Sequence, residues 1–426
     1  MVDFSSSDVR IAVIGLGYVG LPLALALARH YPVVGFDTNS ERLESLTHGE
    51  DRTGEIPPED LQSSPLTFAL RADELADCNL YIVTVPTPIN DDKTPDLSAL
   101  IAASRDIGEV MSAGSVVVFE STVYPGVTEE VCGPELQRAS GLKCGEDFFL
   151  GYSPERINPG DKEHTIDRIT KVVAGQTLEV AALLRDVYGS ALYGGVHVAP
   201  DIRTAEAAKV IENAQRDINI AFINEVAMIF QRLGLDTQDV LAAARTKWNF
   251  LNFQPGLVGG HCIGVDPFYL AHAARLAGHD PEVILSGRRI NDSMAAFVAK
   301  QISAQLPDKA RVLVLGLTFK ENVTDLRNSK TVDLIHALKD DGHTVDVHDV
   351  MADPVEAKHH YDIDLINELS ACTGYHGVVG AVQHDAYRDL SAPALLKMIE
   401  AGGLFADLKG MWRHRELGPE ARYWHL

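Results

Sequence analysis

Arg10-Ile-Ala-Val-Ile-Gly15-Leu-Gly17-Tyr-Val-Gly20 is the stretch that decides the fold. A short apolar run leads into three glycines, and a Leu- and Ala-rich segment follows at Leu21–Arg29. Gly15 allows a tight turn, Gly17 lets the backbone approach a pyrophosphate, and Gly20 lets a helix pack closely on the preceding strand. The amides at the start of that helix would face the phosphates. The stretch predicts a strand, a phosphate-binding turn and a helix.

The next apolar run, Tyr31–Asp37, ends in an acidic residue. An acidic side chain at this point accepts hydrogen bonds from ribose hydroxyls and disfavours a 2′-phosphate, so NAD is expected rather than NADP. Around the turn, Tyr18, Val19 and Arg42 are further candidates for contact with the cofactor.

Strand and helix patterns alternate through the rest of this region. Apolar runs at Leu80–Val85, Ser115–Phe119 and Phe148–Tyr152 are candidate strands, and Leu97–Met111 is a candidate helix. This alternation predicts a doubly wound α/β domain whose parallel sheet is covered on both faces.

Two polar loops follow these strands: Thr84-Val-Pro-Thr-Pro88 and Glu120-Ser-Thr-Val-Tyr-Pro-Gly126. Open α/β sheets bind ligands at the carboxyl ends of their strands. The loops therefore contribute further candidates for the cofactor site, namely Val85, Pro86, Thr87 and Thr122. Ordinary turn chemistry is the alternative explanation, because Pro and Thr are common in loops.

Helical spacing runs from Ile202 to Leu233 without Gly or Pro. Between Ile218 and Phe230 the apolar residues fall on nearly every face, which predicts burial all round. At 1.5 Å per residue the helix would be ~45 Å long, longer than one small domain. We interpret it as a spine that joins two domains and as a dimer interface. The alternative is one long core helix in a monomer.

A second α/β block begins at Arg311-Val-Leu-Val-Leu-Gly316, which echoes the N-terminal run. A helix at Ser329–Lys339 and a strand at Thr344–His348 are expected next, with Asp349 in the place that Asp37 occupies in the first block. The glycine fingerprint is missing, so this domain should bind something else. The predicted domains are 1–201 for the dinucleotide, 202–305 for a central helical dimerisation domain with the cysteine loop, and 306–426 for the substrate.

Gly259-Gly-His-Cys-Ile-Gly-Val-Asp266 carries the strongest chemical signal. Cys262 has glycines nearby on both sides, and charged neighbours can lower a thiol pKa, so it is a candidate nucleophile. One His and one Cys without a C-x-x-C pair do not make a zinc site, and no metal is expected. Lys209 and Asn213 share a helix face, for which a solvated polar stripe is the alternative.

A dinucleotide site combined with a nucleophilic cysteine suggests oxidation through a covalent aldehyde adduct. Removal of a hydride from an alcohol gives an aldehyde, and thiolate attack gives a thiohemiacetal. A second hydride transfer gives a thioester, and water releases a carboxylate.

Composition sets limits on partners and location. There are 37 Lys+Arg and 60 Asp+Glu, a net charge of −23 that disfavours a nucleic-acid binder. No apolar run reaches the roughly 20 residues of a membrane span, and the N-terminus does not read as a signal peptide. Five scattered cysteines favour a reducing cytosol.

Lys320 and Arg327 could hold a phosphate-bearing ligand, although two surface cations are an equal alternative.

Together these motifs resemble the UDP-glucose/UDP-N-acetyl-mannosamine 6-dehydrogenase family, over roughly Arg10 to Asp407. Ser153-Pro-Glu-Arg-Ile-Asn-Pro-Gly160 and Lys247-Trp-Asn-Phe250 look like its UDP-N-acetylhexosamine branch. Within that branch the chain is most similar to UDP-N-acetylglucosamine, or UDP-N-acetylgalactosamine, 6-dehydrogenases of Vi-antigen-type polysaccharide synthesis. The resemblance implies two rounds of NAD-dependent oxidation at C6, which give a hexosaminuronate for surface polysaccharide precursors.

The resemblance also implies roles at matching positions. Cys262 would be the nucleophile, Lys209 and Asn213 would stabilise the oxyanion, and either Lys209 or Asp266 acting through water would transfer protons. Thr122 would place that water and touch NAD, and Glu155 would assist thioester hydrolysis. The implied substrate contacts are Glu155, Arg156, Lys209, Asn213, Phe250, Phe253, Gly256, Gly259, Lys320 and Arg327. One departure is Val265, where the UDP-glucose branch carries a lysine.

Three alternatives stay open. The same chemistry could act on UDP-GalNAc, UDP-ManNAc or UDP-glucose. A 3-hydroxyacid dehydrogenase shares a similar first domain and spine helix but transfers a single hydride and needs no cysteine. A catalytically silent NAD sensor would need neither Cys262 nor Lys209. The number of NADH formed per product, two, one or none, separates these three classes.

Overall fold

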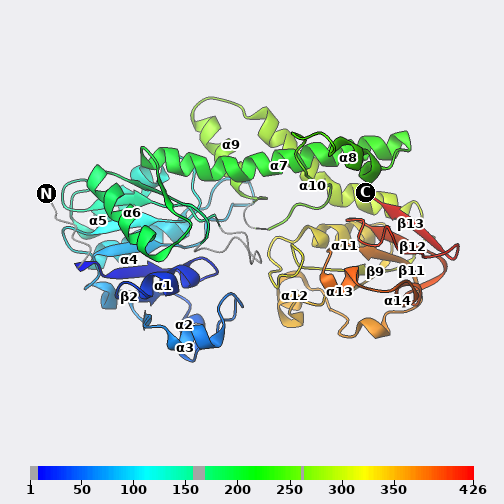
Figure 1. Ribbon diagram of the computed structural model, residues 1–426, viewed down its shortest axis with the longest axis horizontal. Helices are drawn as coiled ribbons and strands as arrows, with labels where there is room; N and C mark the ends of the chain where they lie inside the picture. Colours follow the sequence, from blue (N-terminus) through cyan, green and yellow to red (C-terminus); the bar gives the residue numbers. More distant parts are fainter. Residues whose placement is uncertain (1–7, 157–167, 261–262) are drawn as a thin grey trace. The chain divides into compact units, whose positions relative to one another are not determined.

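The computed structural model describes residues 8–156, 168–260 and 263–426 of the 426-residue chain. It packs as two compact units, Met1–Glu212 with Phe268–Asp280 (unit 1) and Asn213–Pro267 with Pro281–Leu426 (unit 2). Each unit is built on a sheet with helices packed against it (Figure 1). The predicted α/β fold class is thereby confirmed, whereas the predicted three-domain boundaries stay a prediction.

In the described part of unit 1 the sheet has eight strands in the order β3-β2-β1-β4-β5-β6-β7-β8. Its strands are β1 (Ile11–Ile14), β2 (Val33–Phe36), β3 (Thr67–Ala69), β4 (Leu80–Val83), β5 (Val116–Phe119), β6 (Phe149–Tyr152), β7 (Lys171–Gly175) and β8 (Val196–Val198). β1 pairs in parallel with both β2 and β4, so the strand order reverses beside it. This reversal point is where doubly wound sheets bind dinucleotides.

Both faces of that sheet are buried, as the apolar runs predict. Ile11 and Val13 point into a core with helices α1 and α6, and Ala12 and Ile14 point into a core with α4 and α5. The helices of unit 1 are α1 (Gly20–Ala28), α2 (Ser40–Thr47), α3 (Pro58–Ser63), α4 (Ser98–Val110), α5 (Gly133–Ser140) and α6 (Leu178–Ala191), with most of α9 (Asp266–Leu276).

Unit 2 repeats the arrangement on a smaller, fully parallel sheet. In the order β10-β9-β11-β12-β13, its described strands are β9 (Arg311–Leu315), β10 (Thr344–His348), β11 (Tyr375–Gly380), β12 (Ile399–Asp407) and β13 (Ala421–His425). Its helices are α8 (Thr237–Ala244), α10 (Glu282–Ser303), α11 (Lys330–Asp340), α12 (Pro354–Tyr361), α13 (Asp385–Arg388) and α14 (Ala392–Leu396). α10 and α11 bury one face of the sheet, and Tyr387 and Trp412 lie in the core on the other.

Helix α7 spans Ile202–Leu233, as predicted, and contributes to both units. The prediction that it is buried all round is wrong for the single chain. Phe222 is 58% exposed and Ile229 is 47% exposed, whereas Ile223 between them is buried. The helix therefore has a buried face and an apolar face that the chain itself does not cover. Among the described residues, no helix combines the length and apolar character that crossing a bilayer requires.

Candidate functional site

The turn after β1 has the geometry that its three glycines predict. Gly15 has φ +94°, and a Cβ at Gly20 would lie 1.9 Å from the Gly15 carbonyl oxygen, so both positions require glycine. A Cβ at Gly17 would meet no protein atom within 4 Å. The backbone at Gly17 is therefore open to a ligand, at the start of a helix whose free amides suit a phosphate group.

Asp37 at the end of β2 is tied to this turn. Its carboxylate accepts hydrogen bonds from Leu16 N at 2.8 Å and from Asn39 N at 2.9 Å. Arg42 on α2 donates from Nε to the Leu16 carbonyl at 3.0 Å and pairs with Asp51 at 2.7 Å. The glycine turn, the half-buried carboxylate of Asp37 and the buried Arg42 are thus joined by hydrogen bonds. Backbone amides for the pyrophosphate and a carboxylate for the ribose hydroxyls fit NAD.

The loops after β4 and β5 meet the same edge of the sheet. Thr84 Oγ1 donates to the Gly15 carbonyl at 2.6 Å, and Ser121 Oγ donates to the Val85 carbonyl at 2.5 Å. The predicted cofactor contacts Val85, Pro86 and Thr87 belong to the loop after β4, and Thr122 belongs to the loop after β5. These two loops therefore adjoin the glycine turn. Pro86 is exposed in the same loop, while Thr122 is half-buried.

A buried charged cluster lies where β5, β6 and β7 adjoin. Lys171 Nζ is 2.6 Å from Glu120 and 3.4 Å from Glu155, and Tyr188 on α6 donates its hydroxyl to Glu120. The side chains of Glu120 and Lys171 are 0% and 1% exposed. The predicted hydrolytic residue Glu155 is therefore held by a lysine that a second, fully buried carboxylate fixes in place.

Electrostatics in this cluster follow from burial and pairing. Burial raises the pKa of Glu120, although the Lys171 ammonium opposes that change. Burial alone would lower the pKa of Lys171, but the two carboxylates outweigh it and raise that pKa. Burial also raises the pKa of Tyr188, which stays a neutral donor. Lys171 and Tyr188 were not predicted from the sequence. The available signal was a lysine at the start of the apolar run Val172-Val-Ala174.

Unit 2 brings two of the predicted catalytic side chains together. Asn213 Nδ2 donates to Asp266 Oδ2 at 2.5 Å, and both residues are buried. Lys209, one helical turn before Asn213 on α7, is also buried, at 7% exposure. A buried amide fixed by a carboxylate is suited to donate to an oxyanion.

Cys262, the predicted nucleophile, and His261 lie outside the described residues. The preceding segment is pinned at Gly256, where Asn224 accepts from the amide at 2.8 Å and donates to the carbonyl at 3.1 Å. Val265, at the position where the family's UDP-glucose branch has lysine, is buried. The side chain at this position therefore does not lie at the surface of the chain.

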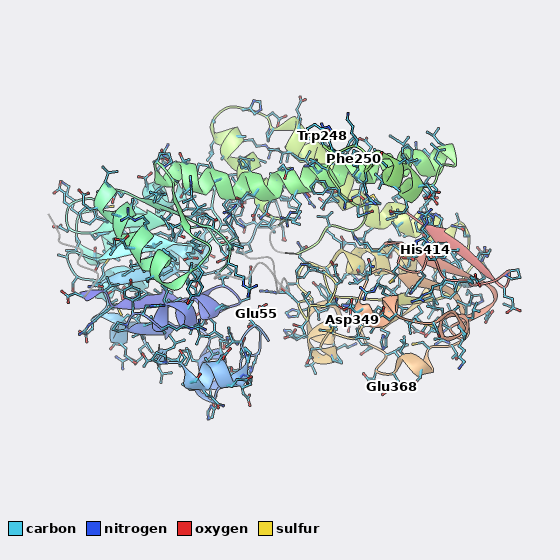
Figure 2. The ribbon with its side chains drawn as sticks, viewed as in Figure 1. Glu55, Trp248, Phe250, Asp349, Glu368 and His414 are labelled. Carbon is cyan, nitrogen blue, oxygen red and sulfur yellow. The ribbon has the colours of Figure 1, made fainter. Side chains whose placement is uncertain are left out.

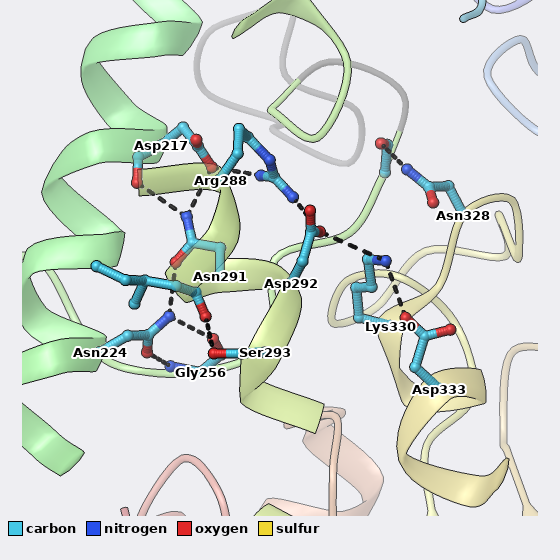
Figure 3. A network of polar contacts seen from close by, with 12 residues as sticks. Asp217, Asn224, Gly256, Arg288, Asn291, Asp292, Ser293, Asn328, Lys330 and Asp333 are labelled. Atoms are coloured by element: carbon cyan, nitrogen blue, oxygen red, sulfur yellow. Dashed lines mark hydrogen bonds and ion pairs between the residues drawn. The ribbon is translucent and has the colours of Figure 1, made fainter. Parts of the chain in front are cut away.

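Asn224 is itself fixed by a chain of polar contacts between α7 and α10 (Figure 3). Asn224 donates to Asn291 at 2.8 Å, and Asn291 donates to Asp217 at 2.7 Å. Arg288 pairs with Asp217 at 2.5 Å and with Asp292 at 2.6 Å. Burial raises the pKa of Asp217 against the pull of Arg288. This network gives the glycine segment a rigid support.

The unit 2 counterpart of the cofactor turn is closed to a dinucleotide. Asp349, after β10 (Figure 2), accepts from Leu317 N at 2.5 Å and Thr318 N at 3.0 Å, much as Asp37 accepts from Leu16. His384 covers the same carboxylate at 3.2 Å, and both side chains are 0% exposed. Burial opposes ionisation, but these hydrogen bonds lower the pKa of Asp349 to about 2. Because the Asp349 carboxylate is fully buried and already accepts these hydrogen bonds, it cannot also accept hydrogen bonds from ribose hydroxyls.

The predicted substrate residues divide between the units. Arg327 is 47% exposed and makes a two-pronged contact with Asp325 at 2.9 and 2.7 Å, in the loop that Lys320 shares. Phe250 and Phe253 are half-buried in the segment after α8, with Phe250 shown in Figure 2. Arg156, in unit 1, pairs with Glu212 at 2.7 Å. The catalytic and substrate roles of all these residues stay predictions.

Comparisons with known proteins agree with this geometry. Residues 9–192 match the NAD binding domain of the UDP-glucose/GDP-mannose dehydrogenase family, residues 203–293 its central domain and residues 313–414 its UDP binding domain. The chain is 51% identical to a UDP-N-acetyl-D-glucosamine 6-dehydrogenase of Pseudomonas aeruginosa over 94% of this chain and 97% of that protein. It is 50% identical to Protein CapL of Staphylococcus aureus, over 98% and 99% of the two chains. A solved UDP-D-ManNAc dehydrogenase of Pyrococcus horikoshii matches with a TM-score of 0.87 at 30% identity, covering 97% of this chain and 98% of that one.

Proposed function

Because this chain belongs to the UDP-glucose/GDP-mannose dehydrogenase family, we propose that its substrate is a UDP-N-acetylhexosamine, with UDP-N-acetylglucosamine favoured. The chain is an NAD-dependent UDP-sugar dehydrogenase. The observation that carries the choice of sugar is the 51% identity, over nearly the full length, to a protein named for UDP-N-acetyl-D-glucosamine. The product would be the corresponding hexosaminuronate, for surface polysaccharide precursors.

NAD, when bound, accepts a hydride from the substrate's C6 carbon in each of two oxidations. The turn at Gly15–Gly20 would hold its pyrophosphate and Asp37 its ribose. In the proposed sequence, the first oxidation converts the C6 alcohol to an aldehyde, and its hydroxyl proton leaves to Lys209 or, through water, to Asp266. The Cys262 thiolate adds to the aldehyde carbon, and the second oxidation turns this thiohemiacetal into a thioester.

Hydrolysis then completes the four-electron oxidation. A water molecule attacks the thioester carbonyl, Glu155 takes its proton, and the carbon–sulfur bond breaks to release carboxylate and the thiolate. Asn213 would stabilise the oxyanion at both addition steps, since Asp266 holds its amide in one orientation at 2.5 Å. Lys171 would keep Glu155 in place for this step, because the lysine is fixed by Glu120, which in turn accepts a hydrogen bond from Tyr188.

The sugar preference is tested by measuring kcat/KM with UDP-GlcNAc, UDP-GalNAc, UDP-ManNAc and UDP-glucose in parallel. We expect the largest value with UDP-GlcNAc, and a smaller one with UDP-GalNAc, which differs only in the direction of the C4 hydroxyl. A preference for UDP-glucose would contradict the assignment to the N-acetylhexosamine branch.

Replacement of Asp37 tests the cofactor site. Asp37→Ala should weaken NAD binding by about 1–3 kcal/mol, because a charge-assisted hydrogen bond to the ribose is lost. NADP should then be rejected less strongly. Asp37→Asn, which can still accept from the Leu16 amide, is the matched variant that separates loss of charge from loss of the turn. Unchanged NAD and NADP affinities in calorimetric titrations would rule out the ribose role of Asp37.

We further propose that the chain forms a homodimer through α7. The support is the exposed apolar row of Phe222, Ile229 and Leu233, the last 64% exposed, on a helix whose other face is buried. Sedimentation equilibrium should give twice the chain mass of 46.3 kDa. Phe222→Lys should lower that mass, whereas Leu178→Lys, at an exposed apolar residue of α6, should not. A monomeric wild-type protein would contradict the proposal.

The cytoplasm is the proposed location. Four cysteines within the described residues, Cys78, Cys132, Cys144 and Cys372, are free thiols, as a reducing compartment favours. Both ligands of the proposed reaction, NAD and a UDP-sugar, are also cytoplasmic metabolites.

A further inference from the structure

Arg42 on α2 places a cation beside the predicted ribose site. The Leu16 backbone joins the two groups, because its amide donates to Asp37 at 2.8 Å and its carbonyl accepts from Arg42 Nε at 3.0 Å. In dinucleotide-binding folds an arginine near this acidic position accommodates the 2′-phosphate of NADP. Arg42 therefore lies where a 2′-phosphate would be recognised, although the domain is one that binds NAD.

Asp51 neutralises this arginine. Its carboxylate lies 2.7 Å from Arg42 Nη1, and the side chains of Arg42 and Asp51 are 10% and 0% exposed. Because the pair is shielded from water, its attraction is screened much less than that of a surface pair. Burial would raise the pKa of Asp51, but hydrogen bonds from Thr53 and the pairing with Arg42 bring this pKa below its usual value. Asp51 therefore carries its negative charge at neutral pH.

The backbone that follows Asp51 holds its carboxylate in place independently of Arg42. Asp51 Oδ2 accepts from the amides of Glu55 and Ile56, each at 3.0 Å, and Oδ1 accepts from the Thr53 amide at 3.0 Å. The Thr53 hydroxyl adds a contact to Oδ1 at 2.7 Å. Within the described residues, Arg42 Nη2 is buried without a hydrogen-bond acceptor. The arginine therefore has a donor left for a ligand oxygen, whereas its charge is already balanced.

We propose that Asp51 is a specificity-determining residue that keeps Arg42 from recognising the 2′-phosphate of NADP. This inference rests on the proposed function, in which Asp37 holds the ribose of NAD. Asp37 repels a 2′-phosphate by its own charge, and Asp51 cancels the attraction that Arg42 would otherwise offer. Loss of Asp37 alone leaves the cation neutralised, so full acceptance of NADP requires both carboxylates to be replaced.

Asp37→Ala, Asp51→Asn and the double variant test this proposal through the ratio of kcat/KM with NADP to kcat/KM with NAD. Asp51→Asn keeps an oxygen for the Glu55 and Ile56 amides but loses the charge. We expect the ratio to rise about tenfold in Asp37→Ala and less than about threefold in Asp51→Asn. In the double variant it should rise about 300-fold or more, beyond the product of the single effects, because a charged hydrogen bond to the phosphate is gained.

The matched control is Asp92→Asn combined with Asp37→Ala. Asp92-Lys-Thr94 repeats the pattern of Asp51-Arg-Thr53, and Asp92 likewise accepts from the amide two residues later, at 2.9 Å, in an exposed turn. This double variant should give the ratio of Asp37→Ala alone. If Asp51→Asn does not fold, Asp51→Ser replaces it in every comparison, since its hydroxyl can accept from one of the same amides.

Calorimetric titration with adenosine 2′,5′-bisphosphate and with AMP measures the phosphate contact without catalysis. The bisphosphate should bind about tenfold more tightly than AMP to the Asp37→Ala/Asp51→Asn variant, and adding Arg42→Met should abolish this difference. A double variant that accepts NADP no better than Asp37→Ala, or a bisphosphate preference that survives Arg42→Met, would overturn the role of Asp51. Unchanged cofactor affinities in Asp37→Ala would instead overturn the ribose role of Asp37, and this inference with it.

Discussion

Cys262→Ser should reduce the release of hexosaminuronate at least a thousandfold, which corresponds to a barrier raised by about 4 kcal/mol or more. A serine hydroxyl has far too high a pKa to supply a comparable nucleophile, so neither the thiohemiacetal nor the thioester can form. NAD affinity should be unchanged, because the predicted cofactor contacts in the glycine turn and at Asp37 do not include Cys262.

The matched control is Cys144→Ser, at a half-buried cysteine beside Gln176 in unit 1. This variant should turn over like the wild type. Uronate would be quantified by chromatography and NAD binding by calorimetric titration. Near wild-type release of uronate by Cys262→Ser would show that the covalent mechanism is wrong.

Lys171→Met should destabilise unit 1 by about 3–5 kcal/mol, because it leaves the carboxylate of Glu120 buried without its cation. Hydrogen exchange at the β5 and β7 amides is the appropriate measurement. Tryptophan fluorescence would not report it, since Trp248, Trp412 and Trp424 all belong to unit 2.

Two further variants test the ion-pair explanation. Lys143→Met removes a lysine from a solvent-exposed pair with Glu146 and should change exchange little. Lys171→Met combined with Glu120→Gln removes both charges of the buried pair and should recover much of the loss. If the double variant is as unstable as Lys171→Met alone, the cost comes from packing and the proposed electrostatic role is contradicted.

Local pattern predicted most of the fold. The turn at Gly15–Gly20, the bounds of α7 and the second α/β domain opening at Arg311 all depend on residues close in sequence, where periodicity and glycine spacing act directly. The similarity between Asp37 and Asp349 was also predicted, from their positions in the sequence. In the structure, Asp37 accepts from the turn after β1 and Asp349 accepts from the turn after β9. The strands that were not predicted are β3, β7, β8, β11, β12 and β13. Among them, β3 and β8 have three residues each and lie at a sheet edge, where burial leaves a weak pattern.

The support of the site could not be predicted. Lys171 meets Glu120 across 51 positions, and Asn328 meets Gly260 across 68, so strand order and loop packing create these contacts. Their residue types carry no local signal, because a lone lysine or asparagine usually lies at the surface.

The wrong prediction that α7 is buried on all sides has a similar cause. Composition indicates that Phe222 and Ile229 avoid water, but not whether the same chain or a second one covers them.

The proposed reaction is a four-electron oxidation of a UDP-N-acetylhexosamine that depends on Cys262. Its most direct test is the amount of NADH formed when UDP-GlcNAc is converted to completion with excess NAD, with the product identified by mass spectrometry. We expect two NADH for each UDP-N-acetylglucosaminuronate and no accumulated aldehyde. One NADH per product would indicate a single hydride transfer, as in a 3-hydroxyacid dehydrogenase. No NADH with any UDP-sugar would indicate an NAD-binding protein without this activity. Either result would contradict the proposed four-electron oxidation.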